Sequence, residues 1–337
     1  MTACAERHDH GRDPDADSGA MTQFTAEYGV RLPPVAVVIA AYNEERGIGD
    51  VVEAISHRVA ELDAATIVVV DGCADDTAAV ARKQGGLVCE VPVNRGQGAA
   101  LRLGYRIARE GGADYIVTTD ADGQYNPAEM ERVLAPVVAG EADFVTGSRK
   151  LGSQETNDLV RRLGTWVFAV TISVLTRQRI TDSSFGLRAM RAEVTGAVRL
   201  EQPQYQSSEL LIAVLAHGFR VVEVPATIHK RKVGESKKGH NAVYGLKFAS
   251  VVVGTWWRER QRRVPGSGSA GRSASGRRPG DRSAAFPAQG EPPALAPDPL
   301  AANGSDGSRS SASGTPAASA ADITDSDTLA PRSAKRR

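Results

Sequence analysis

The chain has 337 residues, a length that fits one large domain or two smaller ones. Its 41 basic and 40 acidic residues nearly balance, which argues against a nucleic-acid-binding protein that relies on bulk positive charge. The three cysteines, Cys4, Cys73 and Cys89, lack metal-ligand spacing and leave one unpaired, which favours a reduced, cytoplasmic chain over a disulfide-linked one.

Both ends of the chain have compositions typical of disordered segments. Residues 1–32 are polar and lack periodicity, and Met21 is a second possible start. We predict no signal peptide, because the N-terminus has no positively charged stretch followed by an apolar core. After the basic run that begins at Arg258, the chain is rich in Ser, Gly, Ala, Pro and Arg, which cannot bury enough apolar surface to offset ordering entropy. We therefore predict one globular domain over 33–258, between disordered segments 1–32 and 259–337.

Strands and helices alternate along the predicted domain. Apolar, β-branched runs predict strands over 35–40, 66–71, 87–91, 114–119 and 143–146. Helical spacing predicts helices over 44–61, 75–84, 96–110 and 127–138, with Asp75 or Asp76 near the start of the second. This order predicts an α/β fold with a mostly parallel sheet and ligands at the carboxyl ends of its strands.

Two carboxylates, Asp120 and Asp122, end the apolar run that starts at Ile116. Their spacing allows both to face one site once the backbone turns at Gly123, and the amide oxygen of Gln124 follows. These hard oxygen ligands suit Mg²⁺ or Mn²⁺, which commonly complete their coordination with substrate phosphates. Taken alone, the stretch is equally consistent with a strand that ends in an Asp-Gly turn.

A series of motifs gives this pattern a family resemblance. In chain order they are AAYNEE, VVDGCADDT, NRGQGAALRLGY, DADGQ, GSR, DSSFGLRAMR, SSEL and RKVGESK. The series resembles family 2 glycosyltransferases of the GT-A fold, and among them the polyprenol-phosphate (dolichol-phosphate) mannosyl- or glucosyltransferases, over about 35–250. The resemblance implies a metal-dependent, inverting transfer of a hexose from a nucleotide-sugar (GDP-mannose or UDP-glucose type) to a polyprenyl phosphate.

The resemblance also assigns the donor side of the site. Asp122 and Gln124 would ligate the metal, Asp120 would contact ribose or metal, and the nucleotide pocket would be lined by Ala41, Tyr42, Glu44 and Asp71. Glu44 is alternatively an acidic first-turn residue favoured by the helix dipole, and Asp71 a turn former.

The sequence departs from the family pattern at two donor-side positions. Val70 stands where the family often has a first Asp before Asp71-Gly72, and Gln97 replaces a usual Lys. Arg95 is our candidate for supplying the missing charge.

On the acceptor side, arginines match phosphate bidentately. The candidate phosphate-binding residues are Arg149, Arg161, Arg162, Ser184, Arg231, Ser236 and Lys237, the last three in a predicted mobile loop. Asp182 resembles the family's acceptor-side Asp. Glu209 opens an apolar helix, and we leave open whether it positions the acceptor or is structural. Three histidines lack ligand spacing and are interpreted as incidental: His217, His229 and His240.

The apolar segments 166–175 and 243–257 are both shorter than the ~20 residues that span a bilayer, so we predict no transmembrane helix. Trp256 and Trp257, followed by Arg258 and Arg260, resemble an interfacial anchor. The alternative is that both segments are core helices under the sheet. We expect peripheral binding at the inner face of the membrane.

Two other functions fit the same fold. In the first, a soluble hydroxyl replaces the lipid phosphate as acceptor, with Glu209 as catalytic base. In the second, the protein is an inactive nucleotide-binding scaffold, which the intact DADGQ and RKVGESK motifs disfavour. A dinucleotide dehydrogenase is set aside because no G-x-G-x-x-G follows the first strand.

Overall fold

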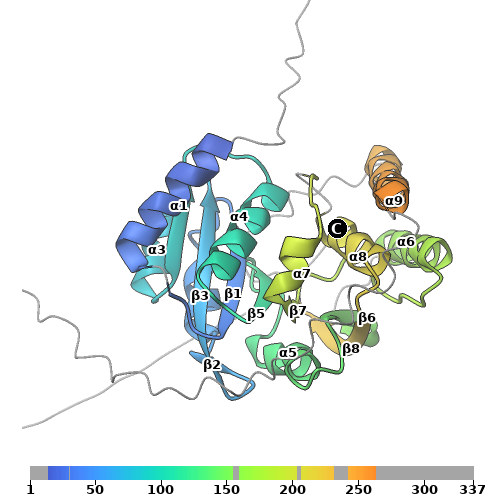
Figure 1. Cartoon of the computed structure of the whole chain (residues 1–337), viewed down its shortest axis with the longest axis horizontal. Helices are drawn as coiled ribbons and strands as arrows, with labels where there is room; N and C mark the ends of the chain where they lie inside the picture. Colours follow the sequence, from blue (N-terminus) through green and yellow to red (C-terminus); the bar gives the residue numbers. More distant parts are fainter. Residues whose placement is uncertain (1–13, 30, 155–158, 203–205, 231–241, 263–337) are drawn as a thin grey trace, which may run out of the picture. The chain divides into compact units, whose positions relative to one another are not determined.

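The computed structural model describes residues 14–29, 31–154, 159–202, 206–230 and 242–262 (Figure 1). Its strands form one sheet in the order β2-β3-β1-β5-β7-β6-β8, with β4 also paired to β3. The strand bounds are β1 (Val35–Ala41), β2 (Arg58–Val59), β3 (Leu62–Asp71), β4 (Leu87–Val91), β5 (Tyr115–Asp120), β6 (Phe144–Gln154), β7 (Arg188–Arg191) and β8 (Val221–Ile228).

The sheet is mostly parallel, as predicted. Strand β1 pairs in parallel with β3 and β5, β3 with β4, and β6 with β8. Strand β7 is antiparallel to both β5 and β6, and the short β2 is antiparallel to β3. The carboxyl ends of β1, β3, β4 and β5 therefore share one edge of the sheet, where ligands bind in folds of this type.

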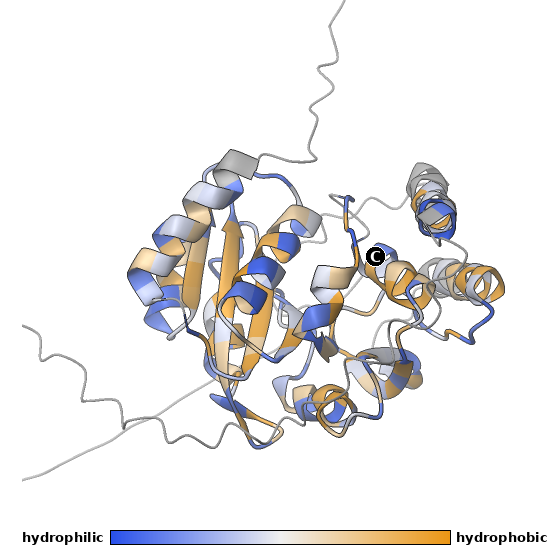
Figure 2. Cartoon of the chain, viewed as in Figure 1, coloured by the Kyte–Doolittle hydropathy of each residue, from blue (hydrophilic) through white to orange (hydrophobic). Residues whose placement is uncertain are grey.

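Helices cover both faces of the sheet because its strands are apolar on both sides. Along β1, Val35, Val37 and Ile39 face one core, whereas Ala36 and Val38 face the other. Figure 2 shows these central strands as hydrophobic ribbons between helices. The first core includes α2 (Ile48–Ala54), α3 (Thr77–Lys83) and α5 (Met130–Val138), and the second includes α1 (Pro14–Tyr28), α4 (Gln97–Glu110), α6 (Leu159–Thr176), α7 (Ala192–Ala197), α8 (Gln206–Ala216) and α9 (Ala242–Arg262).

The helix predicted over 44–61 is shorter in the structure. Helix α2 ends at Ala54, and the chain then forms a hairpin between β2 and β3. Ala60 and Glu61 sit at the turn with φ values of 50° and 63°, which suits the left-handed two-residue turns that join antiparallel strands. The helical spacing of apolar residues therefore predicted a helix in this segment correctly but extended it too far at both ends.

Part of segment 1–32, which we predicted to be disordered, forms helix α1. It runs from Pro14 to Tyr28 and packs along β4. Ala20 and Phe24, one helical turn apart, are buried in the same core as Cys89 and Val91. The surrounding residues give no periodic pattern, so this helix depends on the apolar surface that β4 offers.

The two apolar segments considered for membrane contact form α6 and α9. Within the described part of the chain, no helix is both long and apolar enough to cross a bilayer. Ile172 of α6 and Val252 of α9 are fully buried in the core that also contains α8. One side of each helix therefore packs inward, in agreement with the core-helix alternative.

Candidate active site

The carboxyl ends of β3, β1 and β5 lie side by side. In the sheet register, Ala41 pairs with Val70, directly before Asp71, and Ala40 pairs with Asp120. Parallel pairing thus brings the polar residues after three separate strands to one edge, as the alternation of strands and helices predicted.

The segment that leads into α4 binds the carboxylates at the ends of β3 and β5. The backbone N–H groups of Arg95 and Gly96 donate to Asp71, with the shortest distance 2.7 Å from Gly96 N to Oδ2. Gln97 donates from Nε2 to Oδ1 of Asp120 over 3.0 Å. Asp71 is only 2% exposed, and this burial raises the pKa of its carboxyl, although the two N–H groups oppose the rise. One short segment therefore sets the positions of Asp71 and Asp120.

The guanidinium of Arg95 points to a residue that sequence analysis did not single out. Its NH2 lies 2.7 Å from Oδ1 of Asp17, near the start of α1. The positive charge that we expected Arg95 to supply to the donor is therefore already paired. A lone Asp in a segment without periodicity carries no signal that would have revealed this partner.

The loops after β1 and β3 are joined by hydrogen bonds. Asn43, with φ of 50°, donates from its backbone N–H to Sγ of Cys73 over 3.1 Å and accepts from Ala74 N at Oδ1 over 2.9 Å. Glu44 N donates to Oγ1 of Thr77 over 2.9 Å. These bonds fix the loop that contains the predicted nucleotide-binding residues.

Within that loop, the predicted residues differ in exposure. The side chain of Ala41 is 2% exposed, whereas Tyr42 is 40% exposed. Glu44 lines a cavity of about 70 Å³ that also contains Asp50, Asp122 and Tyr125. Glu44 and Asp122 thus share one cavity although they follow different strands.

Asp122 and Gln124 form a tight turn that is hydrogen-bonded to His229, the residue after β8. Gln124 N donates to Oδ1 of Asp122 over 3.1 Å, and Gly123 adopts φ of 68° between them. The side-chain Nε2 of Gln124 donates to His229 O, and His229 N donates to Gln124 O, both over 2.9 Å. His229, which the sequence suggested was incidental, therefore fixes this turn through its backbone.

The chemistry of these side chains fits a small divalent cation. Asp120 and Asp122 offer carboxylate oxygens, and Gln124 has its amide nitrogen engaged, so its amide oxygen completes a hard donor set. In the described ranges no cluster of three or more His, Cys, Asp or Glu side chains could hold a metal. A cation here would accordingly draw the rest of its coordination from substrate and water.

Gly186 lies close to the carboxylate of Asp120 and to Tyr125, and the sequence did not predict a role for Gly186 or Tyr125. Gly186 N donates to the hydroxyl of Tyr125 over 2.8 Å. A Cβ at Gly186 would lie 2.6 Å from Oδ2 of Asp120 and 2.8 Å from Cε2 of Tyr125. Burial raises the pKa of the Tyr125 phenol, which keeps it neutral. The position after Phe185 thus requires a residue without a side chain.

Arg149 and Asp182 form a buried ion pair. Nε of Arg149 lies 2.6 Å from Oδ2 of Asp182, and the two side chains are 6% and 0% exposed. The guanidinium also donates to Oγ of Ser184 over 3.2 Å, and Ser184 N donates to Asp182 Oδ1 over 3.1 Å. The structure therefore brings together three of the predicted acceptor-side residues.

Glu209 has a structural environment. Its carboxylate is fully buried and accepts hydrogen bonds from the backbone N–H groups of Glu201 and Gln202, over 2.9 and 3.0 Å. Arg258 of α9 pairs with it over 2.9 Å. Among the described residues, its hydrogen-bond partners come from positions 201, 202 and 258, none of which belongs to the strand-end site. This geometry favours the structural interpretation of Glu209 over the catalytic one.

The predicted interfacial anchor on α9 is only partly exposed. Trp256 donates from Nε1 to Leu175 O over 2.9 Å, and the guanidinium of Arg260 lies over its ring. Arg258 pairs with Glu201, Glu209 and Glu259. Trp257 is 56% exposed. Trp256 and Arg258 thus attach α9 to the protein, whereas Trp257 stays exposed, and the interfacial anchor remains a prediction.

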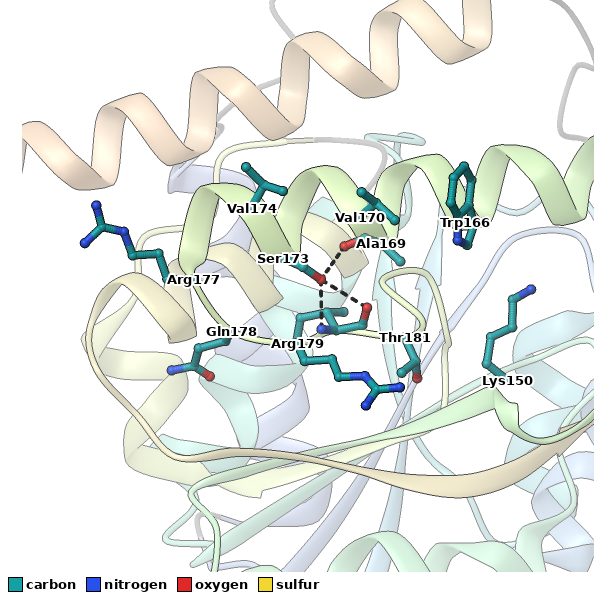
Figure 3. A pocket seen from close by; sticks show the side chains of 11 residues that line it. Lys150, Trp166, Ala169, Val170, Ser173, Val174, Arg177, Gln178, Arg179 and Thr181 are labelled. Atoms are coloured by element: carbon teal, nitrogen blue, oxygen red, sulfur yellow. Dashed lines mark hydrogen bonds between the residues drawn. The ribbon is translucent and has the colours of Figure 1, made fainter.

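A groove with apolar and basic walls lies beside the Arg149–Asp182 pair (Figure 3). Its volume is about 510 Å³, and α6 supplies the exposed side chains of Trp166, Val170 and Val174 at one-turn intervals. Lys150 and Thr181 also line it, and they are the chain neighbours of Arg149 and Asp182. Arg177, Gln178 and Arg179 line it as well.

Five predicted acceptor residues cannot be placed at this site. Arg161 and Arg162 lie in the first turns of α6, but their side chains are not among those that the structure describes. Arg231, Ser236 and Lys237 lie outside the described residues.

Comparison with known proteins agrees with this geometry. A family model described as Glycosyl transferase family 2 matches residues 36–198. The dolichyl-phosphate hexose transferase of Haloferax volcanii is 32% identical over 217 residues, which are 64% of this chain and 89% of that protein. The polyprenol monophosphomannose synthase of Mycolicibacterium smegmatis is 33% identical over 233 residues, or 65% of this chain and 85% of that protein.

Solved structures confirm the predicted GT-A fold. The crystal structure of glucosyl-3-phosphoglycerate synthase from Mycobacterium tuberculosis with Mn²⁺, uridine diphosphate and glucosyl-3-phosphoglycerate superposes with a TM-score of 0.53. The two chains are 19% identical, and the match covers 70% of this chain and 84% of that one. Such a likeness establishes the fold alone, whereas the family model and the relatives above 30% identity establish the family. This chain belongs to glycosyl transferase family 2.

Proposed function

We propose that this glycosyltransferase moves a hexose from a nucleotide-sugar to a polyprenyl phosphate, with inversion at the anomeric carbon. The observation that carries the proposal is the placement of Asp71, Asp120 and Asp122 at one edge of the sheet, with the first two bound by the segment that leads into α4. The named relatives that act on dolichyl or polyprenol phosphates support the choice of acceptor. Residues 33–258 remain our proposed catalytic domain.

On the donor side, the loop of Ala41, Tyr42 and Glu44 and the buried Asp71 would bind the nucleotide. Asp120, Asp122 and the amide oxygen of Gln124 would hold Mg²⁺ or Mn²⁺. A bound divalent cation would neutralise the negative charge that builds up on the leaving diphosphate. Gly186, which donates to the hydroxyl of Tyr125, would leave room for the Asp120 carboxylate, because a Cβ at this position would lie 2.6 Å from its Oδ2.

The transfer itself does not require the protein to remove a proton from the acceptor. An oxygen of the acceptor phosphate would form the new bond to the anomeric carbon, and the electrons of the broken bond would leave with the nucleoside diphosphate. The second pKa of a phosphate monoester is near ~6, so the nucleophile is already anionic at neutral pH. Arg149, oriented by Asp182, remains our candidate for binding that phosphate. Glu209 is not required as a base.

The groove beside Arg149 supports a lipid acceptor. An isoprenoid chain needs apolar contacts close to the residue that binds its phosphate, and Trp166, Val170 and Val174 offer them. Lys150, Arg177 and Arg179 suit the anionic headgroups of a membrane surface. We therefore propose peripheral membrane contact through α6.

The test supplies full-length protein with Mn²⁺ or Mg²⁺, radiolabelled UDP-glucose or GDP-mannose, and undecaprenyl phosphate in detergent. We expect label to enter the organic phase, and Asp122→Ala to abolish this transfer. Asp114→Asn is the matched control, because Asp114 is exposed at the opposite end of β5. Donor turnover that persists in Asp122→Ala would contradict the metal assignment.

Two other outcomes would contradict the acceptor or the activity. Metal-dependent release of sugar without labelled lipid would point to a soluble hydroxyl acceptor, and loss of that release in Glu209→Gln would restore Glu209 as a base. No turnover of either donor would favour the inactive scaffold.

A further inference from the structure

Helix α1 reaches the candidate donor site through one residue. Asp17 lies in the first turns of α1, and its Oδ1 is 2.7 Å from NH2 of Arg95. Arg95 belongs to the segment between β4 and α4 whose N–H groups bind Asp71. The two ends of Arg95 therefore connect a helix at the edge of the sheet with the carboxylate at the end of β3.

The side chain of Arg95 is poorly placed to find another partner in water. It is 12% exposed, and Asp17 is 31% exposed. Its Nε is buried and has no hydrogen-bond partner in the part of the chain that the structure describes. A buried guanidinium needs a charge partner, because leaving it unpaired carries a large desolvation penalty.

Helix α1 holds Asp17 at a fixed place. Phe24 is 4% exposed in the core against β4, and Ala20 O accepts a weak hydrogen bond from Sγ of Cys89 over 3.8 Å. Farther along the helix, Glu27 pairs with Arg82 over 3.3 Å. These contacts join α1 to β4 and α3 along its length, so the position of Asp17 does not depend on its pair with Arg95 alone.

We propose that Asp17 is a positioning residue for the donor nucleotide, acting through Arg95, an inference that rests on the proposed function. With Asp17 in place, the Arg95 guanidinium is directed toward α1 while its backbone N–H supports Asp71. Without Asp17, the guanidinium turns toward the next carboxylate, Asp71, and competes with the N–H groups of Arg95 and Gly96. The segment that also carries Gln97, the partner of Asp120, is then displaced.

The experiment measures binding of UDP and GDP to full-length protein with Mn²⁺ by calorimetry. Asp17→Asn is expected to weaken binding of the preferred nucleotide by roughly fivefold to tenfold, as for loss of one partly buried charge pair. Asp17→Glu keeps the charge and is expected to restore most of the affinity. In an Arg95→Met background, Asp17→Asn is expected to have no further effect.

Glu27→Gln is the matched control, since it removes a different ion pair from the same helix. It is expected to lower the melting temperature less than Asp17→Asn, because Arg82 keeps its pair with Glu90, and to leave nucleotide affinity unchanged. Wild-type affinity in Asp17→Asn, or additive effects of the Asp17 and Arg95 substitutions, would overturn this inference but not the proposed function. Failure of the wild-type protein to bind either nucleotide would overturn the proposed function together with it.

Discussion

Arg149 and Asp182 lie 33 residues apart in the chain, yet Nε of the arginine is 2.6 Å from Oδ2 of the aspartate in a buried pair. The arginine comes from β6 and the aspartate from the segment before β7, two strands that pair antiparallel. Glu223 of β8 fixes that segment, because it accepts the backbone N–H groups of Thr181 and Asp182. The proposed acceptor side is thus built from two strands and the segment before β7.

Removing one member of this pair is expected to destabilise the protein. Asp182→Asn leaves a buried guanidinium without its counter-charge, and such changes lower the free energy of unfolding by about 3–5 kcal/mol. Chemical denaturation measures it. The control is Glu110→Gln, which removes the exposed pair between Arg106 and Glu110 and is expected to cost less than about 1 kcal/mol. If both substitutions lowered the free energy of unfolding equally, burial of the Arg149–Asp182 pair would not make it more stabilising than an exposed pair.

A side chain at position 186 is expected to impair catalysis. Gly186→Ala places a Cβ 2.6 Å from Oδ2 of Asp120, so the carboxylate must move. Misplacement of a catalytic group by about 1 Å can reduce the rate about 100-fold, and we expect a loss of kcat/KM approaching that size. Gly164→Ala in α6 is the control, because its added Cβ meets no atom within 4 Å. Unchanged kcat/KM in Gly186→Ala would show that Asp120 is not constrained.

Burial of Asp71 gives a pH prediction. Its pKa in the folded protein is raised above the ordinary 3.8, so the protonated form is favoured on folding. The group therefore contributes stability that is fully present below pH 3.8 and is lost as pH rises through the raised pKa. Relative to an Asp71→Asn variant, the wild-type protein is expected to gain unfolding free energy as pH falls from 7 toward 3.8. Denaturant titrations at several pH values measure this difference, and an opposite slope would contradict it.

The exposed face of α6 is expected to bind lipid. Val174 is 71% exposed on the groove wall, so Val174→Asp places a charge where acyl chains would lie. We expect a smaller fraction of protein to sediment with phosphatidylglycerol vesicles. Val93→Asp is the control, because Val93 is 65% exposed in the loop after β4. If both variants bound the vesicles equally, α6 would not be part of the proposed membrane-binding surface.

Much of the sheet could be predicted because its information is local. The runs Val35–Ala41 and Tyr115–Asp120 are rich in apolar and β-branched residues, which is typical of strands covered on both faces. Parallel pairing then places their carboxyl ends together, so Asp71, Asp120 and Asp122 could be assigned to one site before any contact was known. The order of the motifs likewise predicted the family.

Other residues acquired their roles only through partners far away in the chain. Glu209 looks like an ordinary first-turn carboxylate, and only the packing of α9 supplies Arg258 and makes it a buried structural ion. Asp17 lies in a polar segment, and only the docking of α1 on β4 brings it to Arg95.

The sequence by itself determined five strands of the sheet, the family and the carboxylates at the strand ends, because strand propensity acts between near neighbours. The strands β2, β7 and β8 and the strand order came only from the structure. The tertiary structure alone decided which charges are neutralised and which apolar faces remain exposed. Burial and ion pairing depend on the segment that packs against a residue, and that segment lies elsewhere in the chain.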